Sequence, residues 1–241
     1  MGDQQYLRFK NYHKMEKLPY VIFADFECSI IGNQNEPKKH VPNSVAYLCL
    51  GYKAGGNIGQ AVNQYEILDC NMFAGDQCVE QFIYRMIELQ KIFEAIPIVP
   101  IIMTHEAELN FLSATHCHIC RKMLTPKNQK NSTVRDHDHF SGVYRGAAHN
   151  TCNLKLRNTS DLNIFFHNGR GYDFHLLVEK LGMIPDISLD CIAENKEKFK
   201  CITINSKIKI KDSFQFLGCS LDALSKNLND DQCVYTKQLD Y

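Results

Sequence analysis

Hydrophobic and polar positions divide the first half of the chain into strands and one long helix. Runs of β-branched and aromatic residues predict three strands, over 20–28, 43–53 and 60–70. Because no helical pattern lies between them, an antiparallel meander is expected. Apolar residues then recur at helical spacing and predict a helix over 76–96, which the Pro97 and Pro100 pair ends.

A polar stretch rich in cysteine and histidine interrupts this pattern from about 112 to 158. The pattern returns afterwards, and it predicts a strand over 161–168, a helix over 171–182, one or two strands in 201–217 and a short helix over 220–228 with Ser220 as its N-cap. The order β-β-β-α, insertion, β-α-β-α predicts an α/β core that a small module interrupts.

Composition adds few exclusions to this picture. The 241 residues are 44% hydrophobic, which is enough for a substantial core, and the formal net charge is zero. No global basic field therefore indicates nucleic acid, although a local basic groove stays open around Lys122, Lys127, Lys130, Arg135, Arg145, Lys155 and Arg157. An odd cysteine count, the lack of an apolar segment after Met1 and the lack of a spanning run predict an intracellular protein with reduced thiols and no membrane partner.

Two matched pairs of metal-binding residues bracket the polar stretch. Cys117 and Cys120 form one pair, and His149 and Cys152 form another at the same spacing. Together they predict a closed Cys₃His zinc site, which suits a segment too small and polar to build its own core. Two buried thiols beside a surface histidine are the alternative, and His116 and His118 are possible substitute ligands.

Between the pairs lies the alternating run Asp136, His137, Asp138, His139. The motif CHIC followed by RDHDHFSGVYRGAAHNTCN resembles the recombination endonuclease VII type of ββα-metal nuclease finger. This resemblance implies that His137 is the general base and that Asp136 and Asn153 hold one magnesium ion, with His139 as an auxiliary site residue. The alternative is a zinc finger that positions DNA without cutting it.

This chain departs from that family at two positions. His149 stands where the family usually has a cysteine, an exchange that zinc tolerates. Val134 stands where a further site histidine is found, which removes one expected contribution to catalysis.

A second group of acidic residues flanks the insertion. Asp25 and Glu27 are two apart in the strand over 20–28, so both carboxylates project from one face. They are either a solvated pair at a strand end or the beginning of a cation site. Downstream, His167, Asn168, Tyr172 and Asp173 precede or begin the helix over 171–182, where Asp173 can also stabilise the helix N-terminus.

The motifs ADFE and HNxxGYDxHL resemble the first and second exonuclease motifs of B-family DNA polymerases. The likeness is greatest to protein-primed polymerases of viruses and Polinton/Maverick mobile elements, several of which carry an endonuclease VII-like module between these motifs. It extends through 9–14, 195–199 and 212–228. The resemblance implies a ribonuclease H-like 3′→5′ exonuclease fold with the zinc-stabilised ββα-metal module inserted.

The same resemblance implies roles for particular residues. Asp25, Glu27 and Asp173 would bind two Mg²⁺ or Mn²⁺ ions. The DNA-binding residues would be Asn168 and Tyr172 at a single-stranded 3′ end, and Ser220 and Leu221 in a stretch that also contacts the terminal protein.

The implied organisation is a lead-in over 1–18, an exonuclease domain over 19–111 and 159–241, and the module over 112–158. The third exonuclease motif, Tyr-x-x-x-Asp, has no good copy, because Tyr235 and Asp240 are five positions apart. We therefore expect a DNA-binding N-terminal fragment of a DNA-directed DNA polymerase that lacks the polymerase domain and has weak exonuclease activity at most. It would serve DNA replication in the nucleus or at a viral replication site. The alternatives are a structure-selective endonuclease acting through the DHDH run, and a non-catalytic zinc-stabilised nucleic-acid binder.

Overall fold

A computed structural model describes residues 18–32, 37–52, 65–124, 131–155, 161–195 and 197–229. These residues fall into two compact units. The small unit takes its described residues mainly from 96–159, and the sheet unit takes its own from 19–52, 65–95 and 160–229. The small unit thus interrupts the sheet unit in the sequence, and each is described separately below.

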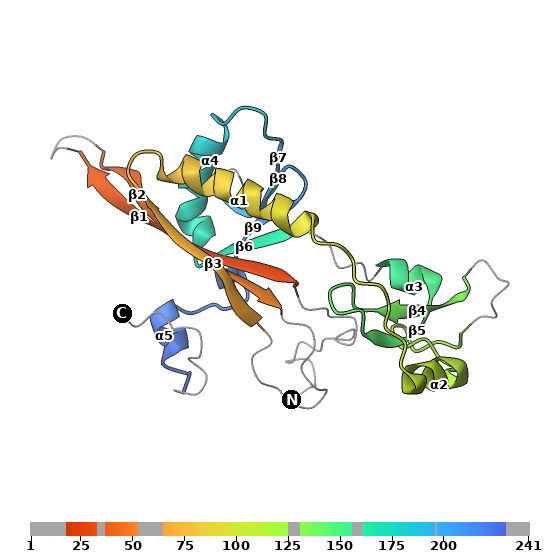
Figure 1. The fold of residues 1–241 in the computed structure, drawn as a ribbon. Helices are drawn as coiled ribbons and strands as arrows, with labels where there is room; N and C mark the ends of the chain where they lie inside the picture. The colour runs from red at the N-terminus through yellow and green to blue at the C-terminus, as the bar shows by residue number, and fades with distance from the viewer. Residues whose placement is uncertain are drawn as a thin grey trace, which may run out of the picture. The chain divides into compact units, whose positions relative to one another are not determined.

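A seven-stranded mixed sheet with the strand order β3-β2-β1-β6-β9-β8-β7 forms the sheet unit (Figure 1). Its strands are β1 (Tyr20–Ile31), β2 (Lys39–Tyr52), β3 (Tyr65–Ala74), β6 (Leu162–Phe166), β7 (Leu189–Ala193), β8 (Phe199–Ile204) and β9 (Ile208–Asp212). The predicted antiparallel meander of β1, β2 and β3 is confirmed. In the centre β1, β6 and β9 run parallel, and β8 and β7 follow antiparallel.

Strand alternation decides which face of this sheet is covered. In β1, Ile22, Ala24 and Phe26 are buried, whereas the odd-numbered positions between them are exposed. The helices α1 (Cys78–Glu94) and α4 (Asp173–Leu181) cover the buried face together (Figure 1). The Phe26 ring packs there on Phe82 and Phe166 at centroid distances of 5.9 and 5.6 Å. Phe26 is therefore a core residue, and the opposite face stays open beside Asp25 and Glu27.

Most of the predicted elements are present, and a strand of the sheet unit and a helix of the small unit are present that were not predicted. Ser220 caps α5 (Leu221–Ser225), because its Oγ accepts the Ala223 N–H at 3.2 Å. The edge strand β7 was not predicted, since all of its residues are exposed and it therefore lacks the alternation of buried and exposed positions that marks a strand. Short 3₁₀ turns are η3 (Gly169–Gly171) and η4 (Ser213–Gln215). The expected segment 9–14 and the positions Tyr235 and Asp240 lie outside the described residues.

The small unit combines a two-stranded sheet with short helices. Its elements are α2 (His105–Ser113), β4 (Thr133–His137), β5 (Tyr144–His149) and α3 (Asn150–Lys155). The strands β4 and β5 pair antiparallel and α3 follows directly, which is a β-β-α order. The helix α2 was not predicted, and Thr104 caps its N-terminus, because the Thr104 Oγ1 accepts the Ala107 N–H at 3.1 Å.

Candidate metal centre and nuclease sites

Four side chains of the small unit converge on one point: Cys117, Cys120, His149 and Cys152. Their ligand atoms all lie within 4.8 Å of one another. Sulfur and imidazole nitrogen at this separation suit a tetrahedral zinc ion. Among the residues that the structure describes, this is the one group of three or more such side chains close enough to share an ion. The four predicted ligands therefore form a cluster that can bind zinc.

The local backbone prepares Cys117 and His149 as ligands, whereas burial and the neighbouring thiols raise the pKa of Cys152 to about 11. Burial alone would raise the pKa of the Cys117 thiol, but backbone N–H groups of Cys120 and His149 outweigh it and hold the pKa at about 6. His149 Nε2 lies 2.9 Å from the carbonyl oxygen of Met123, which leaves Nδ1 facing the thiols, 3.5 Å from Cys120 Sγ. A histidine whose second nitrogen is held by a carbonyl group is typical of metal sites.

Neither substitute ligand faces the cluster. His116 is exposed, and its Nδ1 lies 2.9 Å from Thr115 Oγ1. His118 turns to the other side of the Cys117 turn, where its Nε2 lies 2.8 Å from Asp136 Oδ2. The ring of His118 packs over Gly146, since a Cβ at that position would meet its Cγ at 2.7 Å. His118 thus links the Cys117 turn, which carries two of the clustered side chains, to the DHDH run.

The DHDH run ends β4 and enters a tight turn. Asp138 builds this turn, because its Oδ1 accepts the N–H groups of Phe140 and Ser141 at 2.9 Å each. His137 and His139 are half-buried, with ring centroids 4.9 Å apart. Burial, and then the neighbouring His137, lower the pKa of His139, so that its imidazole is neutral near pH 7. Two imidazoles thus lie side by side at the rim of the unit.

Asp136 has no free carboxylate oxygen in this arrangement. It is 1% exposed, and Arg145 donates to both of its oxygens, from Nη2 at 2.8 Å and from Nε at 3.1 Å. Burial would raise the pKa of Asp136, but His118 and Arg145 together lower it. Asn153 lies half-buried in α3, directly after Cys152. Since Asp136 already gives its oxygens to two donors, these residues do not fit a magnesium ion as they stand.

Replacing Gly142 with alanine is expected to destabilise the small unit. Gly142 has φ of +72°, and an added Cβ would meet the Pro100 carbonyl oxygen at 2.5 Å. The segment with Pro100 is tied to the turn by N–H bonds from Val99 to His139 O and from Ile102 to Gly142 O. We expect a loss of about 1–3 kcal/mol in unfolding free energy, measured by urea titration. Gly218→Ala, at open space, should leave the midpoint unchanged; equal midpoints for both variants would contradict this account of the turn.

The predicted exonuclease acids lie in the sheet unit. Asp25 and Glu27 occupy exposed positions of β1, and Asp173 is the first residue of α4, only 3% exposed. Burial, and then the charge of Asp25, raise the pKa of Asp173 to about 6, and its Oδ1 is buried without a hydrogen-bond partner. Burial and Glu27 likewise raise the pKa of Asp25. Asp25 and Asp173 are thus coupled carboxylates, but with Glu27 they do not gather closely enough to share one ion.

Replacing Asp173 with asparagine should stabilise the sheet unit at neutral pH. The pKa of Asp173 is about 6 in the folded chain and about 3.9 in an unfolded one. The folded chain therefore binds more protons between these values, and the free energy of unfolding falls as the pH rises from about 4 to about 6. We expect Asp173→Asn to gain about 1–3 kcal/mol near pH 7 and to flatten this slope.

Urea titrations at several pH values, without added divalent cations, measure this difference. Asp190→Asn, at an exposed position of β7, is the control. A slope that is unchanged in Asp173→Asn would show that another group is responsible for it.

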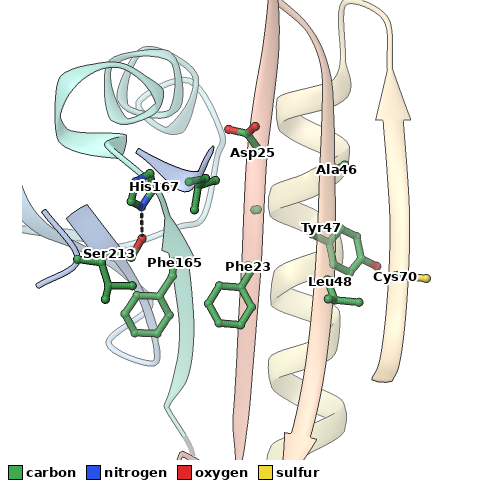
Figure 2. A pocket seen from close by; sticks show the side chains of 12 residues that line it. Phe23, Asp25, Ala46, Tyr47, Leu48, Cys70, Phe165, His167 and Ser213 are labelled. Carbon is green, nitrogen blue, oxygen red and sulfur yellow. Dashed lines mark hydrogen bonds between the residues drawn. The ribbon is translucent and has the colours of Figure 1, made fainter. Parts of the chain in front are cut away.

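A pocket of about 510 Å³ opens on the uncovered face of the sheet beside Asp25 (Figure 2). The rings of Phe23 and Phe165 lie next to each other on β1 and β6, with centroids 6.1 Å apart. The remaining apolar lining of the pocket includes Leu48, Leu217 and Leu221. The structure therefore brings Leu221, predicted to bind DNA, to the same pocket as Asp25, and Ser220 caps the helix that carries it.

Both nitrogens of His167 are engaged at the Asp25 end of this pocket. Nδ1 lies 3.0 Å from Ser213 Oγ, as Figure 2 shows, and Nε2 lies 2.8 Å from the carbonyl oxygen of Cys219. These contacts attach β6 to the segment between β9 and α5. They position the pocket wall and leave His167 no free nitrogen for proton transfer.

The loop between β6 and α4 is held by an aspartate that the sequence did not indicate as a site residue. Asp212 ends β9 at 1% exposure, and its Oδ1 accepts the Asn168 N–H at 2.8 Å. Asn168 itself is exposed with φ of +64°, and the hydroxyl group of Tyr172 lies 2.6 Å from His40 Nδ1. The only signal for Asp212 was its place at the end of an alternating strand, which many structural aspartates share.

Comparisons with known proteins bear on the small unit. None of the helices in the described part of the chain is long and apolar enough to span a membrane. No curated protein and no solved structure matches the chain. A family model described as Recombination endonuclease VII matches residues 101–172, the segment that holds the Cys₃His cluster and the DHDH run. Residues 101–172 therefore carry an endonuclease VII-like domain.

Proposed function

We propose that the small unit is a zinc-stabilised nuclease that cuts within the strands of branched or looped DNA. The observation that carries this proposal is the family match over 101–172, because it covers a cluster that can bind zinc together with two adjacent histidines at the end of β4. The β-β-α order of this segment supports it further.

Proton transfer by His137 would be the chemical contribution of this chain. A half-buried imidazole at the end of β4 can accept a proton from an attacking water near neutral pH. His139, neutral and adjacent, can orient that water or the phosphate group. The magnesium ligands Asp136 and Asn153 stay a prediction, because Asp136 is engaged with other donors.

DNA as the partner follows from the domain and not from the overall charge. Lys122 and Lys155 are exposed in the small unit, whereas Arg135 is paired with Glu108 at 2.7 Å and lies 4.2 Å over the ring of Phe111. In the described part of the small unit, the exposed basic side chains without an acidic partner are few, with Arg121 as a third beside Lys122 and Lys155. This favours shape-dependent recognition of a junction over tight, non-specific binding of duplex DNA.

A four-way junction with a label on each strand tests the proposal. The zinc-loaded full chain with Mg²⁺ is expected to produce internal nicks near the branch point. Salt-sensitive binding without any nick would favour the alternative of a non-catalytic zinc-stabilised binder. The absence of both binding and nicking would reject both readings.

A second candidate activity resides in the sheet unit: 3′→5′ trimming of single-stranded DNA at Asp25 and Asp173. The unpartnered Oδ1 of Asp173 beside Asp25 favours it, since such an oxygen suits a cation. The meander followed by two parallel strands is compatible with a ribonuclease H-like fold. An origin in protein-primed B-family polymerases, with a replication role, a terminal protein partner and a nuclear or viral location, rests on the sequence motifs.

Trimming of a labelled 3′ end, lost in Asp25→Ala, would support this second activity. Because Glu27 does not gather with the other two acids, we expect slow trimming at most. Vigorous trimming that survives Asp25→Ala would rule out this site as its source.

A further inference from the structure

Arg145 covers the most deeply buried carboxylate of the small unit. Its guanidinium donates to both oxygens of Asp136, from Nη2 at 2.8 Å and from Nε at 3.1 Å. The side chain of Asp136 is 2% exposed, whereas that of Arg145 is 27% exposed. A ligand that approaches from solvent therefore reaches the guanidinium before it reaches the carboxylate.

The geometry of the Arg145–Asp136 pair also allows Arg145 to exchange the carboxylate for a phosphate group. A planar guanidinium binds a carboxylate and a phosphate group through the same parallel pair of N–H donors. A phosphate oxygen pair can therefore replace the two oxygens of Asp136 without a change in the number of hydrogen bonds. The charges of Arg145 and Asp136 both act on His139, whose ring centroid lies 4.9 Å from that of His137, so an arriving phosphate would lie near these two imidazoles.

Asp136 would not be left without a partner after such an exchange. His118 Nε2 lies 2.8 Å from Asp136 Oδ2, and the backbone N–H of His118 donates to the backbone carbonyl oxygen of Ala147 at 2.9 Å. The ring of His118 is confined by Gly146, where an added Cβ would clash with it. His118 thus holds one side of the carboxylate in place while the other side becomes available.

We propose that Arg145 is the phosphate-binding residue of the small unit, and that its guanidinium leaves Asp136 for a DNA phosphate group, which frees one side of that carboxylate for a divalent cation. This inference rests on the proposed nuclease function and names how its site meets the substrate. It also accounts for the disagreement between the predicted magnesium ligand and the occupied carboxylate in the structure.

Binding of Mn²⁺ to the zinc-loaded full chain, followed by electron paramagnetic resonance of the free ion, tests the proposal. Asp173→Asn is present throughout, so that the carboxylates of the sheet unit contribute little. Without DNA, adding Arg145→Gln is expected to tighten Mn²⁺ binding by about 10- to 100-fold, the equivalent of one charge-assisted hydrogen bond. Adding Asp136→Asn should remove this gain.

The matched control is Arg135→Gln, an arginine of the same strand pair whose guanidinium contacts Glu108 and Phe111. It should leave Mn²⁺ binding unchanged. With a four-way junction as the ligand, Arg145→Gln should lower the slope of log affinity against log salt by about one. Zinc content is measured for each variant to show that the small unit is folded.

Equal or weaker Mn²⁺ binding in a zinc-loaded Arg145→Gln chain would overturn the proposal, since Arg145 would then only support Asp136. If that variant loses zinc, the wild-type chain provides the test. The ¹⁵N–¹H signal of Arg145 Nε, assigned by its loss in Arg145→Lys, should move when the junction is added, and an unmoved signal overturns the proposal. None of these readings needs cleavage, so a chain that shows them but never nicks DNA contradicts the nuclease function alone.

Discussion

Replacing Cys117 with serine is expected to unfold the small unit while the sheet unit stays folded. Among the described residues, the buried hydrophobic cluster around this residue comprises Cys117, Ile119 and Ala148, and the side chains packed against it include two further predicted zinc ligands, Cys120 and Cys152. A structural zinc site contributes about 10–16 kcal/mol to folding in small zinc domains, and the loss of one thiolate weakens that contribution. The apolar residues buried in the described part of this unit are too few to replace that contribution.

Hydrogen exchange of backbone amides measures this effect unit by unit. In Cys117→Ser, amides of β4 and β5 should exchange rapidly, whereas those of β1 and β6 should keep their protection. Cys191→Ser, at an exposed position of the edge strand β7, is the control and should change neither unit. A chelator should reproduce the selective loss in the wild type, and protection of β4 and β5 that survives metal removal would contradict a structural role for zinc.

Replacing His137 with alanine should lower the rate of nicking of a four-way junction by about 10²–10⁴-fold, the usual contribution of a general base. The variant should bind the junction as well as the wild type, because His137 is proposed to act on a proton and not to hold the DNA. Single-turnover rates with the chain in excess separate these two effects.

His105→Ala is the matched control for this experiment. His105 is exposed at the start of α2 in the same unit and is remote in sequence from the DHDH run. It should cut at the wild-type rate. Nicking by His137→Ala at an undiminished rate would assign the chemistry to other residues.

The sequence predicted the cluster of four side chains because the spacing within each pair is local. The turn before β4 brings Cys117 and Cys120 together, and the start of α3 does the same for His149 and Cys152, whereas the two pairs meet through the pairing of that turn with β5. The exposed face of β1 with Asp25 and Glu27 was predictable for a similar reason, since alternation in a strand assigns alternate residues to one face.

The contacts of Asp136 could not be predicted in this way. They depend on the antiparallel pairing of β4 with β5, which places Arg145 beside Asp136. They also depend on the hydrogen bond from the backbone N–H of His118 to the carbonyl oxygen of Ala147. The sequence offered His118 as a substitute zinc ligand, and only the tertiary structure turns it towards Asp136. The proximity of Asp173 to Asp25 likewise requires β1 and β6 to lie side by side, which the resemblance implied and residue spacing alone did not.

A covalently closed circular DNA with an extruded cruciform tests most directly whether the small unit cuts DNA internally. Such a circle has no 3′ end, so trimming by the sheet unit cannot act on it. We predict that the zinc-loaded wild type with Mg²⁺ converts the closed circle to the nicked form at the cruciform and that His137→Ala does not. A circle that the wild type binds but leaves closed would contradict internal cutting by the small unit, and so would equal nicking by the wild type and the variant.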